Sequence, residues 1–497
     1  MIEISLHSQY ARLGEGFCVP TRPTPVAAPT LIRFNQELAQ QLGLGFARLD
    51  PAGLADVFSG NQVPSGAQPI AMAYSGHQFG HFNPNLGDGR ALLLGELPTP
   101  DGGVQEIHLK GSGPTRFSRN GDGRAALGPV LREYLVSEAM HKLGVPTTRA
   151  LAAVATGEEV FRDRPLPGGV ITRVASSFVR VGTFQHFAMR GDEQAVRKLA
   201  DFVMARLYPQ TLDAEQPYQA LLQEVADRQA KLIAQWMQLG FIHGVMNTDN
   251  MAISGETIDY GPCAFMDQYD HEKVFSSIDH GGRYAYNQQP GIGLWNLTRF
   301  AESLIPLLVP ETKEAVIVAQ NILKHYVDSY EHAWIAGMRA KCGLTENVDA
   351  RVRAEDKALL EELLSIMADN RADFTLTFRH LSHLDSQNEE GDAVLRALFD
   401  DEEDIEHWLA RWRWRVSHEK QGDEQRQRAM QAVNPIYIPR NHLVEAAIRA
   451  AEDHGDLTVF HALHEVLQNP FTEQAGKEMY GQPPRAEEEV TMTFCGT

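Results

Sequence analysis

The stretch FIHGVMNTDNMAISGETIDYGP, residues 241–262, decides how this chain is organised. It begins with a histidine-containing turn and then places Asp249 and Asn250 side by side. The residues that follow, 251–258, predict a short strand, a Ser-Gly-Glu turn and a second short strand. The stretch closes on Asp259, which is followed by Tyr and Gly. The sequence therefore predicts a polar loop followed by a small β-hairpin.

The order of these residues is similar to that in protein kinases, where H-R-D-x-x-x-x-N is followed by D-F-G. Counted from His243, Asn250 takes the place of the kinase Asn, and Asp259 takes that of the D-F-G Asp. Those two kinase residues hold metal ions on the nucleotide phosphates. The catalytic Asp of H-R-D would lie two residues after His243, where this chain has Val245. The pattern therefore predicts a metal site beside a loop that lacks the usual base.

The composition is that of an ordinary globular protein. The chain has 497 residues, of which 43% are hydrophobic and 22% are charged, so it can bury a substantial core. The length fits about three domain-sized units, or a two-lobed enzyme with extensions. The formal net charge of −20 argues against nucleic acid or a membrane surface as a partner, because phosphate groups would be repelled. A local basic pocket for a nucleotide is compatible with that charge.

The cysteines and the apolar runs indicate a soluble cytoplasmic protein. The four cysteines form no C-x-x-C pair, so we expect neither a disulfide framework nor a zinc site. The first residues have no basic-then-apolar pattern, and we expect no signal peptide. No apolar run approaches the ~18 residues that a membrane-spanning helix needs.

Glycines mark the first candidate nucleotide-binding turn, within residues 71–97. Gly87 and Gly89 lead to Arg90 and then to an apolar run, Ala91–Leu94, that predicts a buried strand. A glycine-rich turn lets backbone N–H groups approach phosphate oxygens, and Arg90 would supply a fixed cation. Tight turning without any ligand is the alternative explanation.

The next strand is predicted to deliver a lysine to the same place. Val104–Leu109 alternates apolar and polar residues and ends at Lys110, as the third strand of a kinase does. A second glycine-rich turn, 120–128, precedes a helix expected over 129–143. Glu133, in the first half of that helix, is the expected ion-pair partner of Lys110. A solvated lysine at a strand end is the alternative.

Two further arginines strengthen the prediction of an anionic ligand. Strands are expected at 151–155, 159–161 and 169–174. The last of them presents Arg173, and Arg180 follows. If both point towards Arg90 and Lys110, the four cations repel one another unless an anion lies between them. A triphosphate is such an anion, and arginine suits bidentate contact with it. Scattered surface arginines are the alternative.

The pattern of elements predicts an α+β protein with a protein-kinase-like two-lobed fold, an N-terminal extension and additional C-terminal helices. Four units are predicted. They are an N-terminal extension (1–69), a β-rich nucleotide-binding lobe (70–185), a helical lobe with the catalytic and metal loop (186–430), and a C-terminal helical segment with a flexible tail (431–497). Helices are expected at 31–42, 193–208, 221–239, 295–308, 313–338, 356–371 and 442–452. The acidic stretch 385–404 is expected to be a solvated linker, and Trp408, Trp412 and Trp414 are expected to pack in a core.

Long segments of the chain resemble one family, selenoprotein O, the kinase-like protein adenylyltransferases. The resemblance covers nearly the whole chain, which resembles a bacterial member of the family. It is carried by YSGHQFGHFNPNLGDGRALLLGE (74–96), HLKGSGPTRFSRNGDGRAALGPVLREYLVSEAM (108–140), HGVMNTDNMAISGETIDYGP (243–262), HGGRYAYNQQP (280–290) and NPIYIPRNHL (434–443).

The resemblance implies an enzyme that binds ATP inverted relative to ordinary kinases and transfers AMP to Ser, Thr or Tyr hydroxyls of proteins. Pyrophosphate leaves. It implies Mg²⁺ as the metal, with Mn²⁺ as the alternative, held by Asn250 and Asp259. Asp249 is implied to be the proton acceptor that replaces the base missing at Val245, and Glu133 to be the partner of Lys110. The implied nucleotide-holding set is Gly87, Gly89, Arg90, Lys110, Asp122, Gly123, Arg173 and Arg180.

Three other activities remain open at this point: a protein kinase with a relocated base, UMP transfer with Mn²⁺, and a non-catalytic ATP-binding pseudokinase. The family also often has a selenocysteine or cysteine third from the end, which Cys495 matches. A redox role would need a partner thiol, but the expected position holds Ser276, and Cys263 is the nearest alternative. A thiol without a redox role is therefore the competing interpretation.

Overall fold

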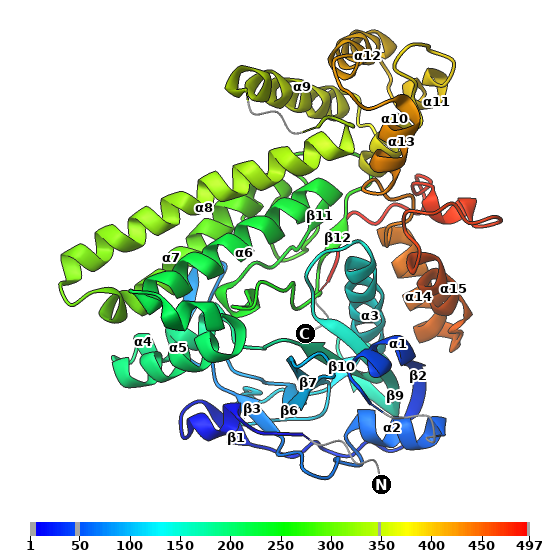
Figure 1. Ribbon diagram of the computed structural model, residues 1–497. Helices are drawn as coiled ribbons and strands as arrows, with labels where there is room; N and C mark the ends of the chain where they lie inside the picture. Colours follow the sequence, from blue (N-terminus) through cyan, green and yellow to red (C-terminus); the bar gives the residue numbers. More distant parts are fainter. Residues whose placement is uncertain (1–5, 45–49, 346–348, 495–497) are drawn as a thin grey trace.

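The computed structural model describes residues 6–44, 50–345 and 349–494. It combines one large antiparallel sheet, built within residues 18–175, with a layer of long helices within residues 181–341. We call these parts the sheet region and the helical region. Figure 1 shows them side by side, with further helices of the C-terminal third beyond both.

Eight of the described strands form the main sheet, in the order β1-β3-β6-β7-β10-β9-β2, with β8 paired to β10. Their bounds are β1 (Cys18–Pro20), β2 (Thr30–Phe34), β3 (Ile70–Met72), β6 (Ala91–Pro98), β7 (Val104–Lys110), β8 (Ala125–Ala126), β9 (Arg149–Phe161) and β10 (Pro165–Ala175). The central strands carry Lys110 and Arg173. The strands predicted at 151–155 and 159–161 are parts of a single long strand, β9.

The first 34 residues supply both edges of this sheet, because β1 pairs with β3 and β2 pairs with β9. The helix predicted over 31–42 is therefore wrong in its first half: Leu31 is in a strand, opposite Val154. The helix starts later, at α1 (Gln36–Gln41), where the side chain of Asn35 accepts a hydrogen bond from the Leu38 N–H. Pairing with a distant strand overrode the local helical pattern.

The helix predicted over 129–143 is α3 (Leu127–Lys142), which lies across the sheet. Residues on all sides of it are buried, as its scattered apolar positions predicted. One side packs on β9 and β10, and the other on two C-terminal helices, α14 (Asn441–His454) and α15 (Thr458–Leu467). α3 is therefore held on both sides, and with it the side chain of Glu133.

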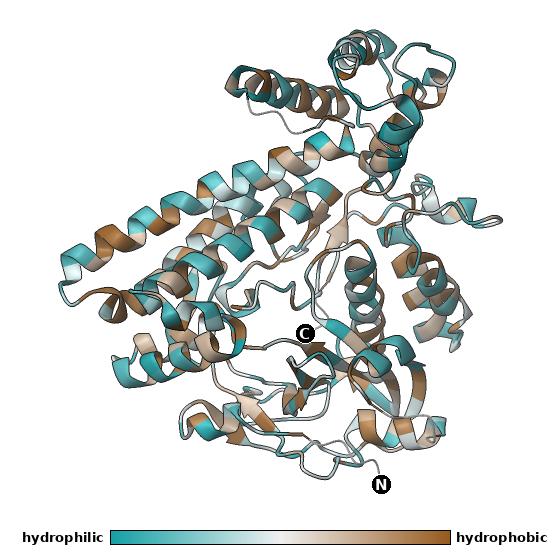
Figure 2. Cartoon of the chain, viewed as in Figure 1, coloured by the Kyte–Doolittle hydropathy of each residue, from teal (hydrophilic) through white to brown (hydrophobic). Residues whose placement is uncertain are grey.

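The helical region is formed by α4 (Val181–Ala188), α5 (Glu193–Leu207), α6 (Pro217–Leu239), α7 (Gln289–Leu308) and α8 (Thr312–Lys341). The long helix α8 packs along α6. In Figure 2, α8 carries both hydrophilic and hydrophobic bands, as expected for a helix with one packed and one exposed face. Gly240, in the left-handed conformation, ends α6, and the stretch 241–262 begins there.

The hairpin predicted at 251–258 does not form. Ala252 makes an isolated bridge to Arg180, and Thr257 makes one to Thr147, so each half pairs with a different part of the chain. Phe241–Ile242 instead forms the short strand β11, which pairs with β12 (Ala264–Phe265). The loop is therefore anchored from both the sheet region and the helical region.

The C-terminal third is helical beyond the predicted extent. Its remaining helices are α9 (Ala350–Asp369), α10 (Phe374–Leu381), α11 (Asp392–Arg396), α12 (Glu402–Val416) and α13 (Asp423–Gln431). The acidic stretch 385–404 is thus only partly a linker, since it contains α11, where Asp392 is buried and paired with Arg413. Trp408 and Trp412 are buried as predicted, whereas Trp414 is 63% exposed.

The tail after residue 470 is not loosely held throughout. Thr493 is buried and forms a parallel bridge with Ser276. Its N–H donates to the Phe275 carbonyl at 2.8 Å, and its hydroxyl donates to the Pro262 carbonyl at 2.5 Å. The tail therefore packs against the end of the stretch 241–262.

None of the described helices is both long enough and apolar enough to cross a membrane.

Candidate active site

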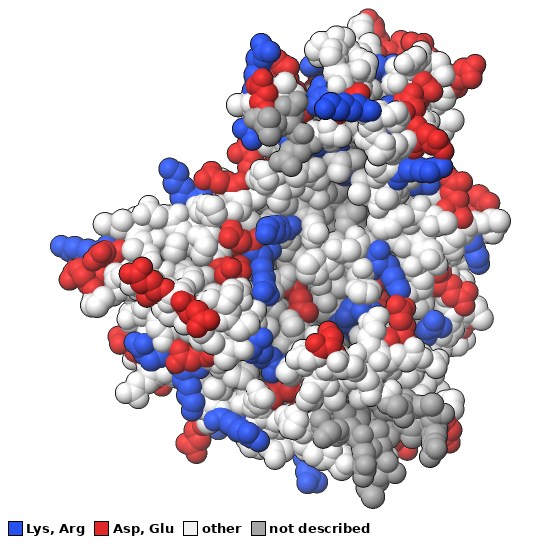
Figure 3. All heavy atoms as spheres, viewed as in Figure 1, with Lys and Arg blue, Asp and Glu red and all other residues white. Residues whose placement is uncertain are grey.

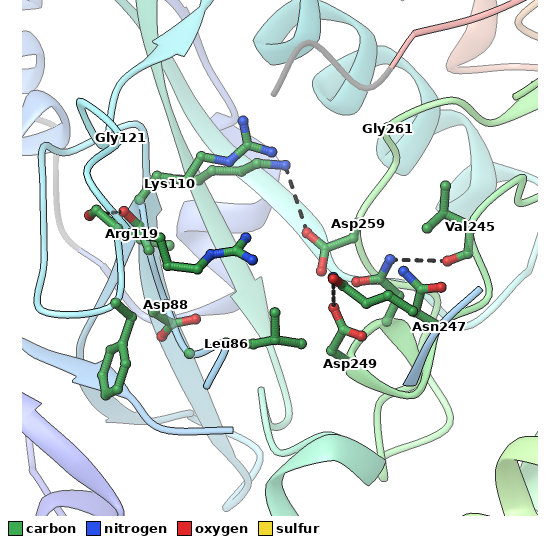
Figure 4. A pocket seen from close by; sticks show the side chains of 18 of the residues that line it. Leu86, Asp88, Lys110, Arg119, Gly121, Val245, Asn247, Asp249, Asp259 and Gly261 are labelled. Carbon is green, nitrogen blue, oxygen red and sulfur yellow. Dashed lines mark hydrogen bonds and ion pairs between the residues drawn. The ribbon is translucent and has the colours of Figure 1, made fainter. Parts of the chain in front are cut away.

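A cavity of about 510 Å³ lies between the sheet region and the loop 245–262. This volume is within the usual range for small-molecule sites. Its walls come from the glycine-rich turns, from β7 and β10, and from the loop itself. Figure 4 shows Lys110 on one side facing Asp259 on the other, with Asp249 beyond Asp259.

The walls of the cavity carry more positive than negative charge. Seven basic residues line it against four acidic ones: Arg90, Lys110, Arg119, Arg124, Arg162, Arg173 and Arg180, and Asp88, Asp122, Asp249 and Asp259. The chain as a whole has a net charge of −20, so this excess is local. In Figure 3, basic and acidic side chains intermingle over the visible face. The cavity is suited to an anionic ligand.

A buried ionic network joins the strands to α3. Lys110 Nζ lies 2.8 Å from Glu133 Oε2, as predicted. Arg173 bonds to the other oxygen of Glu133, and its Nη2 lies 2.6 Å from Asp259 Oδ1. Glu133 lies behind the cavity wall, where it orients two cations and does not itself line the space. Burial is the main cause that lowers the pKa of Lys110.

Asp259 lies among three cations. Besides Arg173, Lys110 Nζ lies 3.7 Å from one of its oxygens and Arg180 Nη2 lies 3.6 Å from the other. Burial alone would raise its pKa, but Arg173, Arg180 and Lys110 together hold that pKa well below the usual range. The carboxylate is therefore ionised. Its backbone has φ of +63°, an uncommon value for a residue other than glycine.

Asp88 lines the cavity, although the sequence did not predict it as a site residue. Its Oδ1 lies 3.3 Å from Arg180 Nη1, and its Oδ2 lies 3.3 Å from His108 Nε2. It also accepts a hydrogen bond from the Met72 N–H. Asp88 thus holds one terminal nitrogen of Arg180, while Asp259 lies near the other. Its position between Gly87 and Gly89 could have indicated a place at the site, but only the two glycines were predicted to lie there.

Asp249 has a different environment from Asp259. Its Oδ2 accepts a hydrogen bond of 3.2 Å from the Gln78 amide. Its Oδ1 is buried and has no hydrogen-bond partner in the described part of the chain. Burial, the largest cause, raises the pKa of Asp249 to about 6; the hydrogen bond from its own backbone, the charge of Arg180 and the hydrogen bond from Gln78 counteract this only in part. A carboxylate with a raised pKa at the wall of a cavity is suited to accept a proton.

Asn250 and Asp259 have the donor atoms that Mg²⁺ prefers. Asn250 donates its amide N–H to the Val245 carbonyl at 3.0 Å, which orients the side chain and leaves its oxygen for a ligand. Within the described residues, no group of three or more His, Cys, Asp or Glu could hold a metal. Magnesium commonly takes one or two protein oxygens and completes its shell with phosphate and water. The two residues fit that mode.

Val245 lines the same cavity as Asp249. The position that the kinase pattern reserves for a base is thus apolar, while a carboxylate from four residues later reaches the same space. That Asp249 is the base stays a prediction.

The glycines of the two turns have close neighbours. A Cβ at Gly87 would lie 2.4 Å from the Phe117 ring, and one at Gly89 would lie 2.9 Å from the Phe117 carbonyl oxygen. A Cβ at Gly123, where φ is +65°, would lie 2.2 Å from the Gly113 carbonyl carbon. Packing of each turn against residues 113–118 is therefore sufficient to require glycine at these positions.

Asp122 lies at the mouth of the cavity, where its side chain is 45% exposed. Arg162 Nη1 lies 2.8 Å from Asp122 Oδ2. The hydrogen bond from Arg162 is the main cause that lowers the pKa of Asp122. Asp122 therefore positions Arg162, and it is the least enclosed of the predicted site residues.

The structure brings the predicted site residues together. Those that line the cavity are Gly87, Gly89, Arg90, Lys110, Asp122, Gly123, Arg173, Arg180, Asp249, Asn250 and Asp259. Glu133 is one layer behind them. The prediction about Cys495 lies outside the described residues; Cys263 is buried, and Ser276 contacts Thr493.

Comparison with known proteins points to one family. Residues 1–468 match the family described as protein adenylyltransferase SelO. A protein from Rhodopseudomonas palustris strain HaA2, named protein nucleotidyltransferase YdiU, is 57% identical over 496 residues and is covered along its whole length. Proteins of the same name from Rhizobium meliloti and Agrobacterium fabrum are 54% and 55% identical, with 100% and 99% of each chain covered. The chain belongs to the SelO family of protein adenylyltransferases.

Proposed function

We propose that this protein transfers AMP from ATP to Ser, Thr or Tyr hydroxyl groups of other proteins and releases pyrophosphate. One observation carries the chemistry: the buried carboxylate of Asp249, one oxygen of which has no hydrogen-bond partner among the described residues, shares a cavity with the cation-held Asp259. The relatives' name, protein nucleotidyltransferase, supports the reaction class.

The proposed fold is protein-kinase-like and two-lobed. Three observations support it: a strand-borne lysine paired with a helix-borne glutamate, a long helix that ends just before the loop, and a cavity between sheet and helices. The four units predicted from the sequence remain a proposal.

The proposed ligand set divides the site in two. Arg90, Lys110, Arg173 and Arg180 would neutralise the phosphates, and Arg162, held by Asp122, would extend this basic wall to the mouth. Asn250 and Asp259 would hold Mg²⁺, with Mn²⁺ as the alternative. When bound, the ion would neutralise charge that builds up on the phosphate oxygens.

In the proposed reaction, the acceptor hydroxyl oxygen attacks the α-phosphorus of ATP. The bond between that phosphorus and the α,β-bridging oxygen breaks, and pyrophosphate leaves with the electron pair. The hydroxyl proton moves to the Asp249 carboxylate. Attack at the α-phosphorus requires the inverted nucleotide that the family resemblance implies. The residues contribute alignment, charge neutralisation and one base, which is what such transfers need.

The test is to incubate the protein with ATP, Mg²⁺ and a mixture of acceptor proteins, and to weigh the acceptors by mass spectrometry. We expect the mass of one AMP residue to be added at Ser, Thr or Tyr, and Asp259→Ala to abolish the addition. Asp404→Asn, on the exposed first turn of α12, is the control and should behave as wild type.

Other products would overturn the proposal in defined ways. An added phosphate would identify a kinase. Preferential UMP transfer from UTP with Mn²⁺ would identify a different nucleotide donor. Stabilisation by ATP without any labelled product would identify a nucleotide-binding protein without catalysis.

A further inference from the structure

A small hairpin from the sheet region contacts the loop that carries Asp249. It consists of β4 (Gly76–Gln78) and β5 (His81–Asn83), which pair only with each other among the described strands. Its first strand packs against the single helical turn η3 (Thr248–Asn250) and against α4. The hairpin precedes β6 in sequence, whereas η3 follows α6, so this contact joins the two sides of the cavity.

Backbone groups of the hairpin bind the residues just before Asp249. The His77 N–H donates to Thr248 Oγ1 at 2.7 Å, and the Phe79 N–H donates to Asn247 Oδ1 at 3.1 Å. Gln185 of α4 contacts both residues of the first hydrogen bond. Its Oε1 accepts a hydrogen bond from the Thr248 hydroxyl at 2.6 Å, and its Nε2 lies 2.9 Å from His77 Nδ1. The hairpin and the loop are therefore held in one register.

That register places Gln78 on Asp249. The Gln78 side-chain amide donates to Asp249 Oδ2 at 3.2 Å, and both residues line the cavity. The other oxygen, Oδ1, is buried and accepts no hydrogen bond from the described residues. Gly76 leaves room for this arrangement, because a Cβ there would lie 2.5 Å from Oδ1.

Other charged groups do not hold Asp249 in the same way. Arg180 lowers its pKa by charge, and Asp259 raises it by repulsion. Tyr74 and Tyr284 are also near enough for their own pKa values to be affected by Asp249. Within the described chain, the Gln78 amide is the side-chain group that makes a hydrogen bond to the Asp249 carboxylate.

We propose that Gln78 is a positioning residue for the transfer: it holds Asp249 Oδ2 and so fixes the plane of the carboxylate that takes the proton of the incoming hydroxyl. This inference rests on the proposed function. A carboxylate held at one oxygen has a fixed plane, whereas one without the amide can rotate, and a small misplacement of a reacting group has a large effect on rate. The hydroxyl would then be aligned only when the hairpin and the loop are packed together.

The test compares Gln78→Met with wild type in the AMP-transfer assay. Methionine keeps the length of the side chain but has no N–H donor. We expect kcat to fall about 10- to 100-fold, the scale seen when a supporting hydrogen bond to an active group is removed. The KM for ATP, the thermal midpoint and the ATP-induced stabilisation should stay unchanged. A general structural defect would alter all of them.

Two further variants make the result specific. His81→Ala changes an exposed side chain of the same hairpin and should retain wild-type kcat. Gln78→Met added to Asp249→Asn should cause no further loss, because the group that Gln78 positions has already been removed.

Each outcome decides whether Gln78 positions Asp249. Wild-type kcat in Gln78→Met, or a further loss in the double variant, overturns the role of Gln78 while the transfer activity stands. An inactive wild-type chain overturns the proposed function and this inference with it.

Discussion

The two aspartates of the loop 241–262 are ten residues apart, line one cavity and have opposite environments. Asp259 is surrounded by Lys110, Arg173 and Arg180, which keep its pKa low. Asp249 has one amide donor on one oxygen, and burial raises its pKa to about 6. Identical side chains thus acquire different acidities from their neighbours: the Asp259 carboxylate stays ionised, whereas the Asp249 carboxylate takes up a proton more readily.

Asp259→Asn tests the anionic half of this comparison and should have the largest effect. It leaves three buried cations without their shared carboxylate and removes one predicted metal ligand. We expect transfer to fall at least about 10³-fold and the free energy of unfolding to drop by about 3 kcal/mol. Single-turnover assays and thermal unfolding measure the two effects. Activity within tenfold of wild type would show that Asp259 is structural only.

Asp249→Asn tests the other half. Because an amide does not accept a proton as a base, we expect kcat to fall about 10²- to 10⁴-fold. ATP should still stabilise the variant as it does the wild type, since the cations around Asp259 are untouched. A thermal-shift titration with ATP measures this. Loss of nucleotide binding would mean that the two aspartates share one task.

Gly76→Ala tests how tightly the base is enclosed. The added methyl group would lie 2.5 Å from Asp249 Oδ1, so the carboxylate or the hairpin must shift. We expect kcat to fall about tenfold by misplacement of the base, with ATP affinity unchanged. Isothermal titration with ATP and steady-state kinetics separate the two quantities. The matched control is Gly281→Ala, where a Cβ meets nothing within 4 Å.

Asp122→Asn should have a small effect, because Asp122 pairs with Arg162 at the exposed mouth. Exposed ion pairs contribute up to about 1 kcal/mol. We expect the KM for ATP to rise about two- to threefold, and more at low than at high salt, since salt screens this pair. Measuring KM at two ionic strengths tests the expectation; a large loss that does not depend on salt would place Asp122 among the essential residues.

Lys341 shows what a buried charge does when the described part of the chain gives it no ionic partner. Its Nζ lies 4.3 Å from the centre of the Phe378 ring, and none of the described carboxylates forms an ion pair with it. Burial lowers the pKa of Lys341 to about 7. The unfolded chain therefore binds this proton more tightly than the folded one, and the resulting destabilisation grows as pH falls from about 10 to about 7.

Lys341→Met should accordingly stabilise the protein and leave transfer unchanged. We expect a gain of about 1–3 kcal/mol at pH 6 and a smaller one at pH 10. Denaturant unfolding at both pH values measures the difference. A variant that is less stable at pH 6 would show that the aromatic contacts of Lys341 outweigh the cost of burying its charge.

The sequence predicted the parts of the site whose partners follow a regular pattern. Lys110 at a strand end and Glu133 in the following helix meet at 2.8 Å because the strand and helix form where their periodicity indicates. Asp88 and Gln78 were missed because their partners are far along the chain. Gln78 contacts Asp249 only after α4 and α6 have placed the loop, and no local pattern records that contact.

The wrong predictions of secondary structure have the same cause, namely partners far along the chain. Leu31 has sequence neighbours typical of a helix, yet it lies in strand β2 because its backbone pairs with that of Val154 in β9. Residues 251–258 look like a hairpin, yet Ala252 and Thr257 find their partners in Arg180 and Thr147. Tertiary pairing overrides local preference in short segments. The long helices α6 and α8 were predicted to within a few residues because their own periodicity is sufficient.

The edge strands β1 and β2 have a consequence for the order of events during synthesis. Both leave the ribosome early, but β2 has no partner until β9 has been made. The sheet therefore stays open on that side while most of it is being translated, and pairings so distant in sequence form slowly. During that interval, the backbone groups of β2 are exposed to other nascent chains. A chain shortened to begin at β3 would keep both edges open permanently and would be prone to aggregate.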